Sequence, residues 1–384
     1  MRIAIVRQRY NPYGGAERFV SRALAALAAR GVDATVVTRD WRGAEQADGY
    51  AVLRVAPFHV GRLMRDRGFA AAVCARLARE HFDLVQSHER LECCDVYRAG
   101  DGAHRVWLDR RARDGGPLVR VAQALSPYHR YVLAAERRMF ASPRLRAVIC
   151  NSRMVAHEIR EHFGVADEKL HVIYNGVDLA RFHPGLRGAH RAALRARLGI
   201  PESAFVYLHV GSGFARKGVA RALHALAALP DRDARLVVVG RDRAAAGMER
   251  LAARLGLAAR VHFAGAQEDV APWYGMADAF VLATLYDPMP NAAVEALASG
   301  LPIVVTAQCG AAELVATDAS GEVCDAFDPA SVARAMQAVA TGDAEARRRA
   351  ARDSVAALSL EAMGARLVAL YEALLARKAE GRGV

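Results

Sequence analysis

The sequence predicts an α/β protein built from two doubly wound domains. Short, continuous apolar runs alternate with Ala-, Leu- and Arg-rich helical patterns through most of the 384 residues, and this alternation restarts after a Pro- and Gly-bearing link at residues 175–188. Apolar runs without a polar face are typical of parallel strands that helices cover on both sides. The length also suits two domains, at about 150 residues each.

The expected elements follow in chain order. In the first half, strands are expected at residues 2–6, 34–38, 51–55, 84–86, 147–150 and 171–173, and helices at residues 16–30, 69–80 and 152–163. In the second half, strands are expected at residues 205–210, 235–239, 261–263, 279–282 and 302–305, with helices between them and from about residue 329. We therefore expect an N-terminal domain at residues 1–174, a second domain at residues 175–355, and a C-terminal helix at residues 356–384 that packs back toward the N-terminal domain.

The composition limits the classes of protein. Hydrophobic residues make up 53% and charged residues 24%, which is a globular balance. No apolar run reaches the roughly 18 residues that a membrane-spanning helix needs, and the apolar start of MRIAIVRQRY is too short for a signal peptide. The six cysteines form no C-x-x-C pair, so we expect reduced thiols in a cytosolic protein and no zinc ribbon or thioredoxin motif.

The positive charge is concentrated in one part of the chain. The formal net charge is +12, and residues 98–146 hold eleven arginines against four acidic residues. Such a cluster favours a polyanionic partner, which could be nucleic acid, an anionic membrane or a phosphorylated substrate. A general preference for Arg over Lys is the alternative cause of the charge. Aromatic residues are only 7%, and no known nucleic-acid module is present, so we expect no nucleic-acid partner.

Ligands of open parallel sheets bind at the carboxyl ends of strands, so the loops after strands are the candidate sites. The loop NPYGGAERF places Gly14 and Gly15 before a helix whose free amides would attract an anion, although the sequence lacks the G-x-G-x-x-G pattern. In HVGSGFARKGV, Arg216 and Lys217 follow a Gly-rich turn and open a helix, which is a pattern suited to binding a diphosphate. A plain turn with surface cations is the alternative.

The stretch LYDPMPNAAVEALASGLP carries two carboxylates eight residues apart. We expect Asn291 to cap the helix, with Glu295 on its first turn and Asp287 in the loop before it. Carboxylates accept hydrogen bonds from the hydroxyls of ribose and hexose, and the first amides of the helix suit phosphate oxygens. The alternative for Glu295 is a favourable interaction with the helix dipole.

Three further stretches have candidate roles. In RAGDGAHRVWL, Asp101 and then His104 are candidates for the base that accepts a hydroxyl proton, against the alternative of a simple Asp-Gly turn. The D-x-D at residues 231–233 precedes an expected strand, so it lies at the wrong end of the sheet for a ligand site. Residues 118–140 interleave Arg, Tyr and aliphatic residues on a helical segment broken by Pro127, which is typical of an interfacial helix or of an ordinary amphipathic one.

Four of these motifs together resemble the retaining family-4 glycosyltransferases of the GT-B fold, in which two Rossmann-like domains face each other across a cleft. DPMPNAAVEALASGLPIV resembles their E-x7-E signature, GSGFARKG their diphosphate loop, YNPYGGAERF their N-domain glycine loop and NGVDLARF their hinge. The four occur in the family's order and cover most of residues 1–345. The sequences and spacing of the motifs are most similar to those of lipopolysaccharide-core glucosyltransferases that extend the inner-core heptose.

The resemblance implies a role for each matching position. Glu295 would bind the ribose, Asp287 would hold the hydroxyls of the donor sugar, and Arg216 and Lys217 would neutralise the leaving diphosphate without a metal ion. The family usually has Glu at the position of Asp287, which bears on the choice of sugar. The implied catalytic residues are Asp101, His104 and Asp287. The implied donor-binding residues are Gly14, Gly15, Arg181, Arg216, Lys217, Met289, Pro290, Asn291, Ala292 and Glu295.

The expected function is thus a retaining, metal-independent transfer of a hexose, glucose first, from a UDP-sugar to a lipopolysaccharide-core heptose or a similar lipid-linked glycan. The resemblance implies no cofactor beyond the UDP-sugar, and a cytoplasmic protein held peripherally at the inner face of the membrane through residues 105–140. Two alternatives remain at this point. One is a sugar-nucleotide 2-epimerase of the same fold, and the other is a basic protein without enzymatic activity that binds anionic membrane or nucleic acid.

Overall fold

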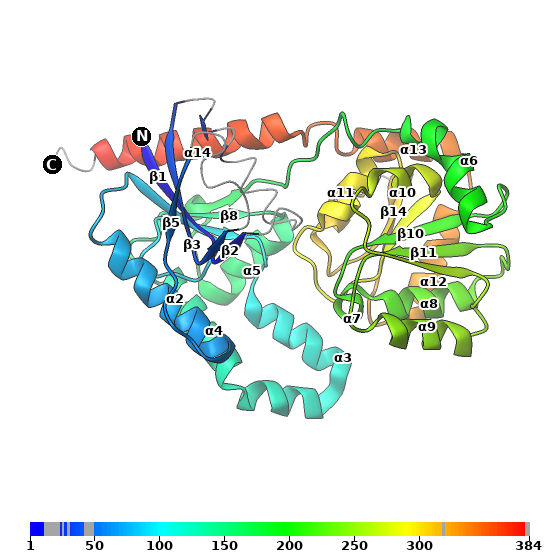
Figure 1. The fold of residues 1–384 in the computed structure, drawn as a ribbon, viewed down its shortest axis with the longest axis horizontal. Helices are drawn as coiled ribbons and strands as arrows, with labels where there is room; N and C mark the ends of the chain where they lie inside the picture. Colours follow the sequence, from blue (N-terminus) through cyan, green and yellow to red (C-terminus); the bar gives the residue numbers. More distant parts are fainter. Residues whose placement is uncertain (11–23, 25–26, 29–30, 42–49, 317–318, 381–384) are drawn as a thin grey trace. The chain divides into compact units, whose positions relative to one another are not determined.

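The computed structural model describes residues 1–10, 24, 27–28, 31–41, 50–316 and 319–380. The chain forms two compact units (Figure 1). Unit 1 comprises Met1–Gly176 and Leu360–Val384, and unit 2 comprises Val177–Ser359. The chain therefore leaves unit 1, builds all of unit 2, and returns to unit 1 with its last helix.

Unit 1 contains a parallel sheet of seven strands. Their order across the sheet is β5 (Tyr50–Arg54), β3 (Asp33–Thr38), β1 (Arg2–Val6), β6 (Leu84–Ser87), β7 (Val96–Ala99), β8 (Ala147–Cys150) and β9 (Leu170–Val172). Ile3 pairs with Ala34 on one side and with Leu84 on the other. The direction in which successive strands are added therefore reverses between β1 and β6. A separate parallel pair joins β2 (Arg9–Tyr10) to β4 (Asp40–Trp41).

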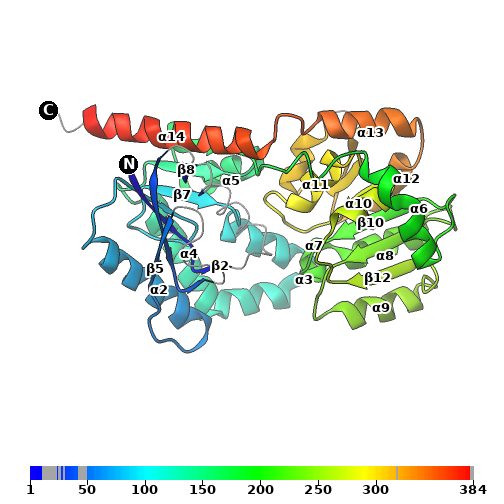
Figure 2. The same cartoon turned by 45° about the horizontal axis from the view of Figure 1, so that its top comes forward.

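Helices cover both faces of this sheet because its strands are apolar on both sides. One face packs on α2 (Gly61–Leu77), α4 (Pro127–Phe140) and α5 (Arg153–Phe163). The other face packs on α14 (Leu360–Glu380), and Figures 1 and 2 both show α14 on the side opposite α2 and α4. The buried Tyr371 of α14 donates a hydrogen bond to the side chain of Gln86 at 2.5 Å. The described residues of unit 1 also form α3 (His104–Leu125) and the short η1 (Asp167–Lys169).

Unit 2 contains a parallel sheet of six strands. Their order is β12 (Val261–Gly265), β11 (Arg235–Val239), β10 (Val206–Val210), β13 (Ala279–Leu282), β14 (Ile303–Thr306) and β15 (Gly321–Cys324). Leu208 of β10 pairs with Val237 and with Phe280. The reversal of strand order in this sheet lies between β10 and β13.

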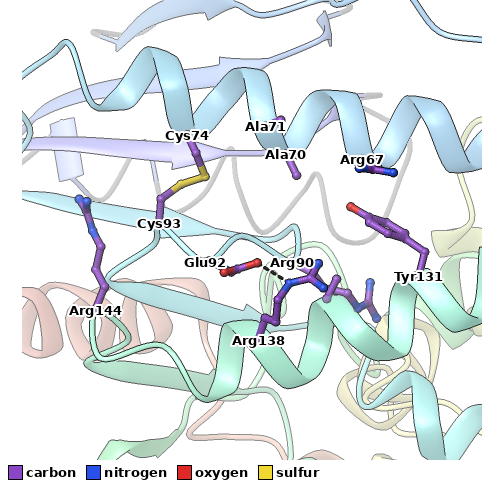
Figure 3. Close-up of a pocket in the computed structure, with 11 residues that line it drawn as sticks. Arg67, Ala70, Ala71, Cys74, Arg90, Glu92, Cys93, Tyr131, Arg138 and Arg144 are labelled. Atoms are coloured by element: carbon purple, nitrogen blue, oxygen red, sulfur yellow. Dashed lines mark hydrogen bonds and ion pairs between the residues drawn. A yellow bond between two sulfur atoms is a disulfide. The ribbon is translucent and has the colours of Figure 1, made fainter.

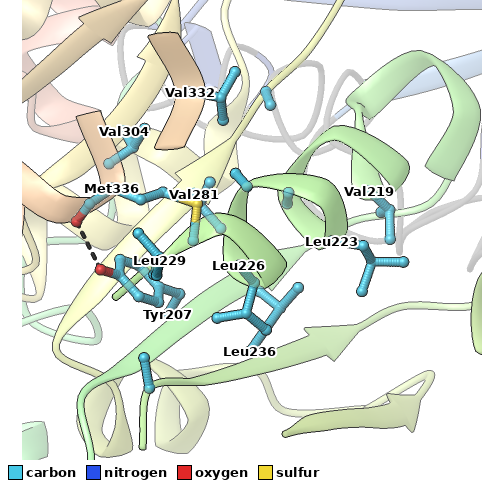
Figure 4. Close-up of a cluster of buried hydrophobic side chains, with 14 of the residues drawn as sticks. Tyr207, Val219, Leu223, Leu226, Leu229, Leu236, Val281, Val304, Val332 and Met336 are labelled. Atoms are coloured by element: carbon cyan, nitrogen blue, oxygen red, sulfur yellow. Dashed lines mark hydrogen bonds between the residues drawn. The ribbon is translucent and has the colours of Figure 1, made fainter. Parts of the chain in front are cut away.

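The helices of unit 2 also lie on both faces of their sheet. One face packs on α8 (Val219–Ala228), α9 (Ala245–Arg254) and α12 (Pro329–Val339). In this core the hydroxyl of Tyr207 donates to the carbonyl of Met336 at 2.6 Å (Figure 4). The other helices are α6 (Leu186–Leu198), α7 (Phe214–Lys217), α10 (Ala271–Met276), α11 (Asn291–Ala298), η2 (Gly310–Leu314) and α13 (Ala344–Asp353).

The predicted fold class, two doubly wound parallel sheets, is confirmed. Strands predicted at residues 2–6, 147–150, 235–239 and 279–282 match to the residue. Two strands of the main sheets were not predicted. β7 contains the buried Arg98 and β15 contains Glu322, so neither is a continuous apolar run. The predicted helix at residues 16–30 lies almost entirely outside the described residues.

The expectation of reduced cysteines is wrong for one pair. Cys74 of α2 and Cys93, in the loop between β6 and β7, form a disulfide with a Cα–Cα distance of 5.7 Å. Their sequence separation of 19 matches no short cysteine motif, and the two meet only because α2 packs over that loop. The other four cysteines are free and buried. In the part of the chain that the structure describes, no helix has the length and apolar character needed to cross a bilayer.

Candidate active site

The reversal of strand order in unit 2 brings the loops after β10 and β13 together, which is where open parallel sheets bind ligands. One glycine allows this close approach. Gly218 has φ +77°, and a Cβ atom there would lie 1.8 Å from the carbonyl oxygen of Ala283, so a side chain at this position would separate the two loops. Gly211, with φ +144°, leaves room for Lys217, whose Nζ would lie 2.9 Å from a Cβ atom there.

Arg216 and Lys217 from the first loop face Asp287 from the second. Arg216 Nη1 donates to Asp287 Oδ2 at 3.2 Å and to the carbonyl of Tyr286 at 2.8 Å, while Lys217 Nζ lies 3.6 Å from the same Oδ2. The Asp287 side chain is only 10% exposed, whereas that of Arg216 is 38% exposed. One carboxylate thus faces two cations, and a surplus positive charge remains at the carboxyl edge of the sheet.

The backbone of Asp287 is also held firmly. Its N–H donates to the carbonyl of Gln308 at 3.2 Å, and its carbonyl accepts from the N–H of Gly310 at 2.9 Å. These bonds attach the loop after β13 to the loop after β14. The position of the carboxylate is therefore set by three neighbouring strands rather than by one loop.

The helix that follows begins differently from the prediction. Pro290 occupies the N-cap position and Asn291 is the first residue of α11, so the predicted cap at Asn291 is wrong. Glu295 consequently lies in the second turn and not in the first, where there is no acidic residue. Met289 and Pro290 precede the helix, and Asn291 and Ala292 lie in its first turn. All four lie between the two carboxylates along the chain.

Glu295 is buried and is oriented by an aromatic hydroxyl. Tyr274 of α10 donates to Glu295 Oε2 at 2.9 Å, and both residues are at most 5% exposed. The Tyr274 ring in turn packs edge-on against the Phe182 ring, with 5.6 Å between the two ring centroids. The contact from Tyr274 gives one oxygen of this buried carboxylate a hydrogen-bond donor. The sequence did not suggest Tyr274, because it lies in an apolar segment with no recognisable motif.

Asp242 was also missed, and it changes the interpretation of the Gly-rich turn. The amides of Gly213 and Phe214, at the start of α7, donate to Asp242 Oδ2 at 2.6 and 3.1 Å. Hydrogen bonds from the amides of Ala244, Gly213 and Phe214 lower the pKa of Asp242 from its ordinary value. The first amides of this one-turn helix are therefore occupied, and Arg216 and Lys217 lie in its last turn. The side chains of the two cations, more than the helix terminus, carry the positive charge of the loop.

A neutral histidine lies close to this charge. His209 of β10 is buried, and its Nδ1 lies 3.2 Å from the carbonyl of Val281. Burial, together with the nearby charge of Lys217, lowers the pKa of His209 to about 3. The ring therefore adds no further charge beside the cation pair at neutral pH.

The other residues predicted for the donor site have no described contact to Arg216, Lys217 or Asp287. Arg181 is about half exposed, and its Nη2 donates to Asp269 at 2.8 Å. Gly14 and Gly15 lie outside the described residues. The D-x-D sequence forms a turn before β11, where the Asp233 amide donates to Asp231 at 2.8 Å, so it lies at the amino edge of the sheet as predicted.

The two candidate bases lie in unit 1, where the chain passes from β7 to α3. Asp101 is exposed in the turn, and His104 is the first residue of α3. The backbone N–H of His104 donates to Glu136 at 2.8 Å, and its Nε2 lies 3.0 Å from Nδ1 of His129. Burial, with the nearby Arg90 and His129, lowers the pKa of His104 to about 3. His104 is therefore a weak base, and Asp101 is the more accessible of the two.

Family models match both halves of the chain. The model for glycosyl transferases group 1 matches residues 190–354, and the model for glycosyltransferase family 4 matches residues 13–181. The lipopolysaccharide glucosyltransferase WaaG of Escherichia coli K12 is 28% identical over 326 residues, which cover 84% of this chain and 85% of that protein. A D-inositol 3-phosphate glycosyltransferase of Streptomyces scabiei is 30% identical over 376 residues, which cover 88% and 81%.

A solved glycosyltransferase structure has the same fold as this chain. The crystal structure of WaaG, a glycosyltransferase involved in lipopolysaccharide biosynthesis, superposes with a TM-score of 0.81 at 26% identity and covers 96% of this chain and 99% of that one. The family predicted from the four motifs is thereby confirmed. The chain belongs to the group 1, family 4 glycosyltransferases, and it is a glycosyltransferase with the GT-B fold.

Proposed function

We propose that this glycosyltransferase transfers a hexose, with glucose as the first candidate, from a UDP-sugar to a lipopolysaccharide-core heptose or a similar lipid-linked glycan. The observation that carries the proposal is the arrangement of Arg216, Lys217 and Asp287 at the carboxyl edge of the unit 2 sheet. The name of the Escherichia coli relative, a lipopolysaccharide glucosyltransferase, supports both the sugar and the acceptor.

The proposed donor contacts follow from the charges. Arg216 and Lys217 bind the diphosphate, because paired cations with donor groups suit phosphate oxygens. Glu295, oriented by Tyr274, accepts hydrogen bonds from the ribose hydroxyls. Asp287 accepts from a hydroxyl of the hexose while it stays beside the two cations. This contact places the hexose next to the diphosphate to which it is bonded.

The proposed reaction is a front-face displacement that retains the configuration at the anomeric carbon. A bond forms between the acceptor oxygen and the anomeric carbon as the bond to the diphosphate breaks. The negative charge that develops on the leaving phosphate is stabilised by Arg216 and Lys217, which makes a divalent cation unnecessary. The acceptor proton passes to the leaving phosphate or to a base of unit 1. Asp101 is the better candidate for that base, because it is exposed in the turn before α3.

A lipid-linked acceptor would be reached at a membrane, and α3 has a surface suited to that. Leu118, Val121 and Leu125 lie three and four residues apart on α3, and each is more than half exposed. Exposed apolar side chains among arginines are typical of helices that lie in the membrane interface. We propose that α3 docks this enzyme on the inner face of the cytoplasmic membrane.

Vesicle binding tests the docking directly. We expect the wild-type protein to bind vesicles that contain anionic lipid. We expect this binding to be lost when Leu118, Val121 and Leu125 are all changed to Ser. The matched control is Val323→Ser, which removes an apolar side chain that is 45% exposed in unit 2. Equal binding of the triple variant and the control would exclude α3 as the docking surface.

The donor is tested by calorimetry with UDP, UDP-glucose, UDP-galactose, UDP-GlcNAc, GDP-mannose and ADP-heptose in the presence of EDTA. We expect UDP-glucose to bind with EDTA present, and Glu295→Ala to weaken UDP itself. Asp287→Ala should reduce turnover and sugar discrimination more than the affinity for UDP. Equal UDP affinity in wild type and Glu295→Ala would contradict the ribose contact.

The acceptor is tested separately with radiolabelled UDP-glucose and a truncated lipopolysaccharide that ends in heptose. Incorporation into the lipid fraction is the expected result. Because one relative is named a D-inositol 3-phosphate glycosyltransferase, inositol 3-phosphate is the second acceptor to offer. Conversion of the sugar nucleotide without transfer to any acceptor would instead indicate the epimerase reaction.

A further inference from the structure

Unit 1 contains a cavity of about 870 Å³ that takes no part in the proposed reaction (Figure 3). It lies between α2 and α4, beside the loop between β6 and β7. In Figure 3, Arg67 and Tyr131 stand at one end of this space and the Cys74–Cys93 disulfide stands at the other. The volume is within the range of small-molecule sites, which is about 300–1,000 Å³, and it is far larger than a single phosphate ion needs.

Four arginines from different elements line the cavity: Arg67 on α2, Arg138 on α4, and Arg90 and Arg144 on loops. Glu92 is the one acidic residue among the described lining residues. Arg90, Arg138 and Arg144 each have a carboxylate partner, at 2.9, 2.6 and 3.6 Å. Arg67 is exposed and has no ion pair or hydrogen bond with any described residue. Its guanidinium is therefore available to an anionic ligand.

Several guanidinium groups of the cavity lie near one phenol, that of Tyr131, and affect its pKa. Burial raises the pKa of Tyr131, the nearby Asp66 raises it further, and Arg138, Arg67 and Arg90 lower it. Three guanidinium groups thus act on a single phenol from two helices and a loop. An anion beside Tyr131 would interact with the same three groups.

Small side chains line the centre of the cavity, and a disulfide connects two of its walls. Ala70, Ala71 and Ala135 leave the centre open, and the Cys74–Cys93 disulfide ties α2 to the loop that carries Glu92. The Glu92 carboxylate and the Tyr131 hydroxyl can bond to sugar hydroxyls, and guanidinium groups bind phosphate through paired N–H donors. A hollow with both kinds of group suits a polar ligand that carries one concentrated negative charge.

We propose that this cavity binds a phosphorylated sugar, at a site separate from the nucleotide-sugar site of unit 2. Arg67 and Arg138 hold the phosphate, and Glu92 and Tyr131 contact the hydroxyls of the ring. The proposal is independent of the donor and acceptor proposed above. A flat anionic membrane is the other ligand that arginines favour, but it would place lipid against an acid, Glu92, inside a hollow.

Calorimetry on the full chain with glucose 6-phosphate, glucose and inorganic phosphate tests this proposal. We expect glucose 6-phosphate to bind at least tenfold more tightly than inorganic phosphate, with no detectable binding of glucose. The double variant Arg67→Ala, Arg138→Ala should lose at least tenfold in affinity. The matched control is Arg76→Ala, since Arg76 is also on α2 but lies outside the cavity and pairs with Glu80 at 2.7 Å. Circular dichroism and thermal unfolding verify that each variant is folded.

Two further measurements separate the cavity from the nucleotide-sugar site and from a lipid surface. The variant Arg216→Ala should bind glucose 6-phosphate like wild type, and saturating UDP should not displace it. Loss of binding in Arg216→Ala, or equal binding by the double variant and the control, would overturn the proposal. So would the absence of glucose 6-phosphate binding together with binding to phosphatidic acid vesicles that needs Arg67 and Arg138, because that result assigns the cavity to lipid headgroups.

Discussion

The two units share parallel sheets with a reversal of strand order, yet the charged groups beside the two reversals are arranged differently. In unit 2, Arg216 and Lys217 share one carboxylate, and a surplus positive charge remains. In unit 1, Arg7 after β1 lies 3.6 Å from Glu89 after β6, so a cation faces a carboxylate beside that reversal. The same topology provides two ligand edges, and among the residues that the structure describes the edge of unit 2 is the one where two cations share a single carboxylate.

The largest effect should come from removing a cation of unit 2. We expect Lys217→Ala to lower kcat/KM about 100- to 1,000-fold, because charge stabilisation at a leaving group is worth about this much. The control is Arg232→Ala, at the opposite edge of the same sheet, which should change kcat/KM less than threefold. If kcat/KM of the Lys217→Ala variant stays within threefold of wild type, the diphosphate does not bind at Lys217.

Reduction of the disulfide should lower the stability of unit 1 and leave the stability of unit 2 unchanged. Closing a loop of this length is worth about 3 kcal/mol in the chain-entropy account, and the Cys74–Cys93 bond lies wholly in unit 1. We expect dithiothreitol to lower the melting temperature of unit 1 in scanning calorimetry and to leave that of unit 2 unchanged. A Cys74→Ser, Cys93→Ser variant should show no response to the reductant.

A smaller effect is expected from the hydroxyl that orients Glu295. The bond from Tyr274 to this carboxylate should be worth about 1.5 kcal/mol, so Tyr274→Phe should weaken UDP binding about tenfold. Tyr207→Phe removes another buried hydroxyl of unit 2, which donates to Met336 away from the carboxyl edge. That control should lower stability without changing the affinity for UDP measured by calorimetry.

The partly buried His104 of unit 1 gives the folding stability a dependence on pH. The pKa of His104 is about 3 in the folded protein and about 6.5 in an unfolded chain. Between these values the unfolded state binds a proton that the folded state does not, so this contribution to stability is present above pH 6.5 and is lost as pH falls. We expect His104→Gln to reduce the loss of melting temperature between pH 6.5 and 4.5. The exposed His81→Gln serves as the control.

The smallest effect should come from Arg181, which the resemblance placed at the donor. Its exposed pair with Asp269 is worth about 0.2–1 kcal/mol. We expect Arg181→Ala to change the Kd for UDP-glucose less than threefold. A loss of tenfold or more would mean that Arg181 leaves Asp269 and contacts the donor.

Sequence patterns predicted most of the fold because the central strands are continuous apolar runs. They failed at β7, whose buried Arg98 interrupts the run. At the candidate site, local motifs carry Arg216, Lys217 and Asp287, which the structure brings together, while the role of Glu295 stays a prediction. The sequence pattern missed Tyr274 and Asp242, which reach the site from other elements, so their contacts depend on tertiary packing. The cysteine pair was missed for the same reason.

The return of the chain to unit 1 has a consequence for synthesis on the ribosome. The residues of unit 2 are contiguous, so this unit can fold as soon as it has emerged. Unit 1 must wait for part of the cover of its sheet, because Leu367 and Tyr371 of α14 are made after all of unit 2, whereas Leu24 and Leu27 of the same core cluster are made early. The nascent chain therefore keeps part of an apolar sheet face unpaired throughout the synthesis of unit 2.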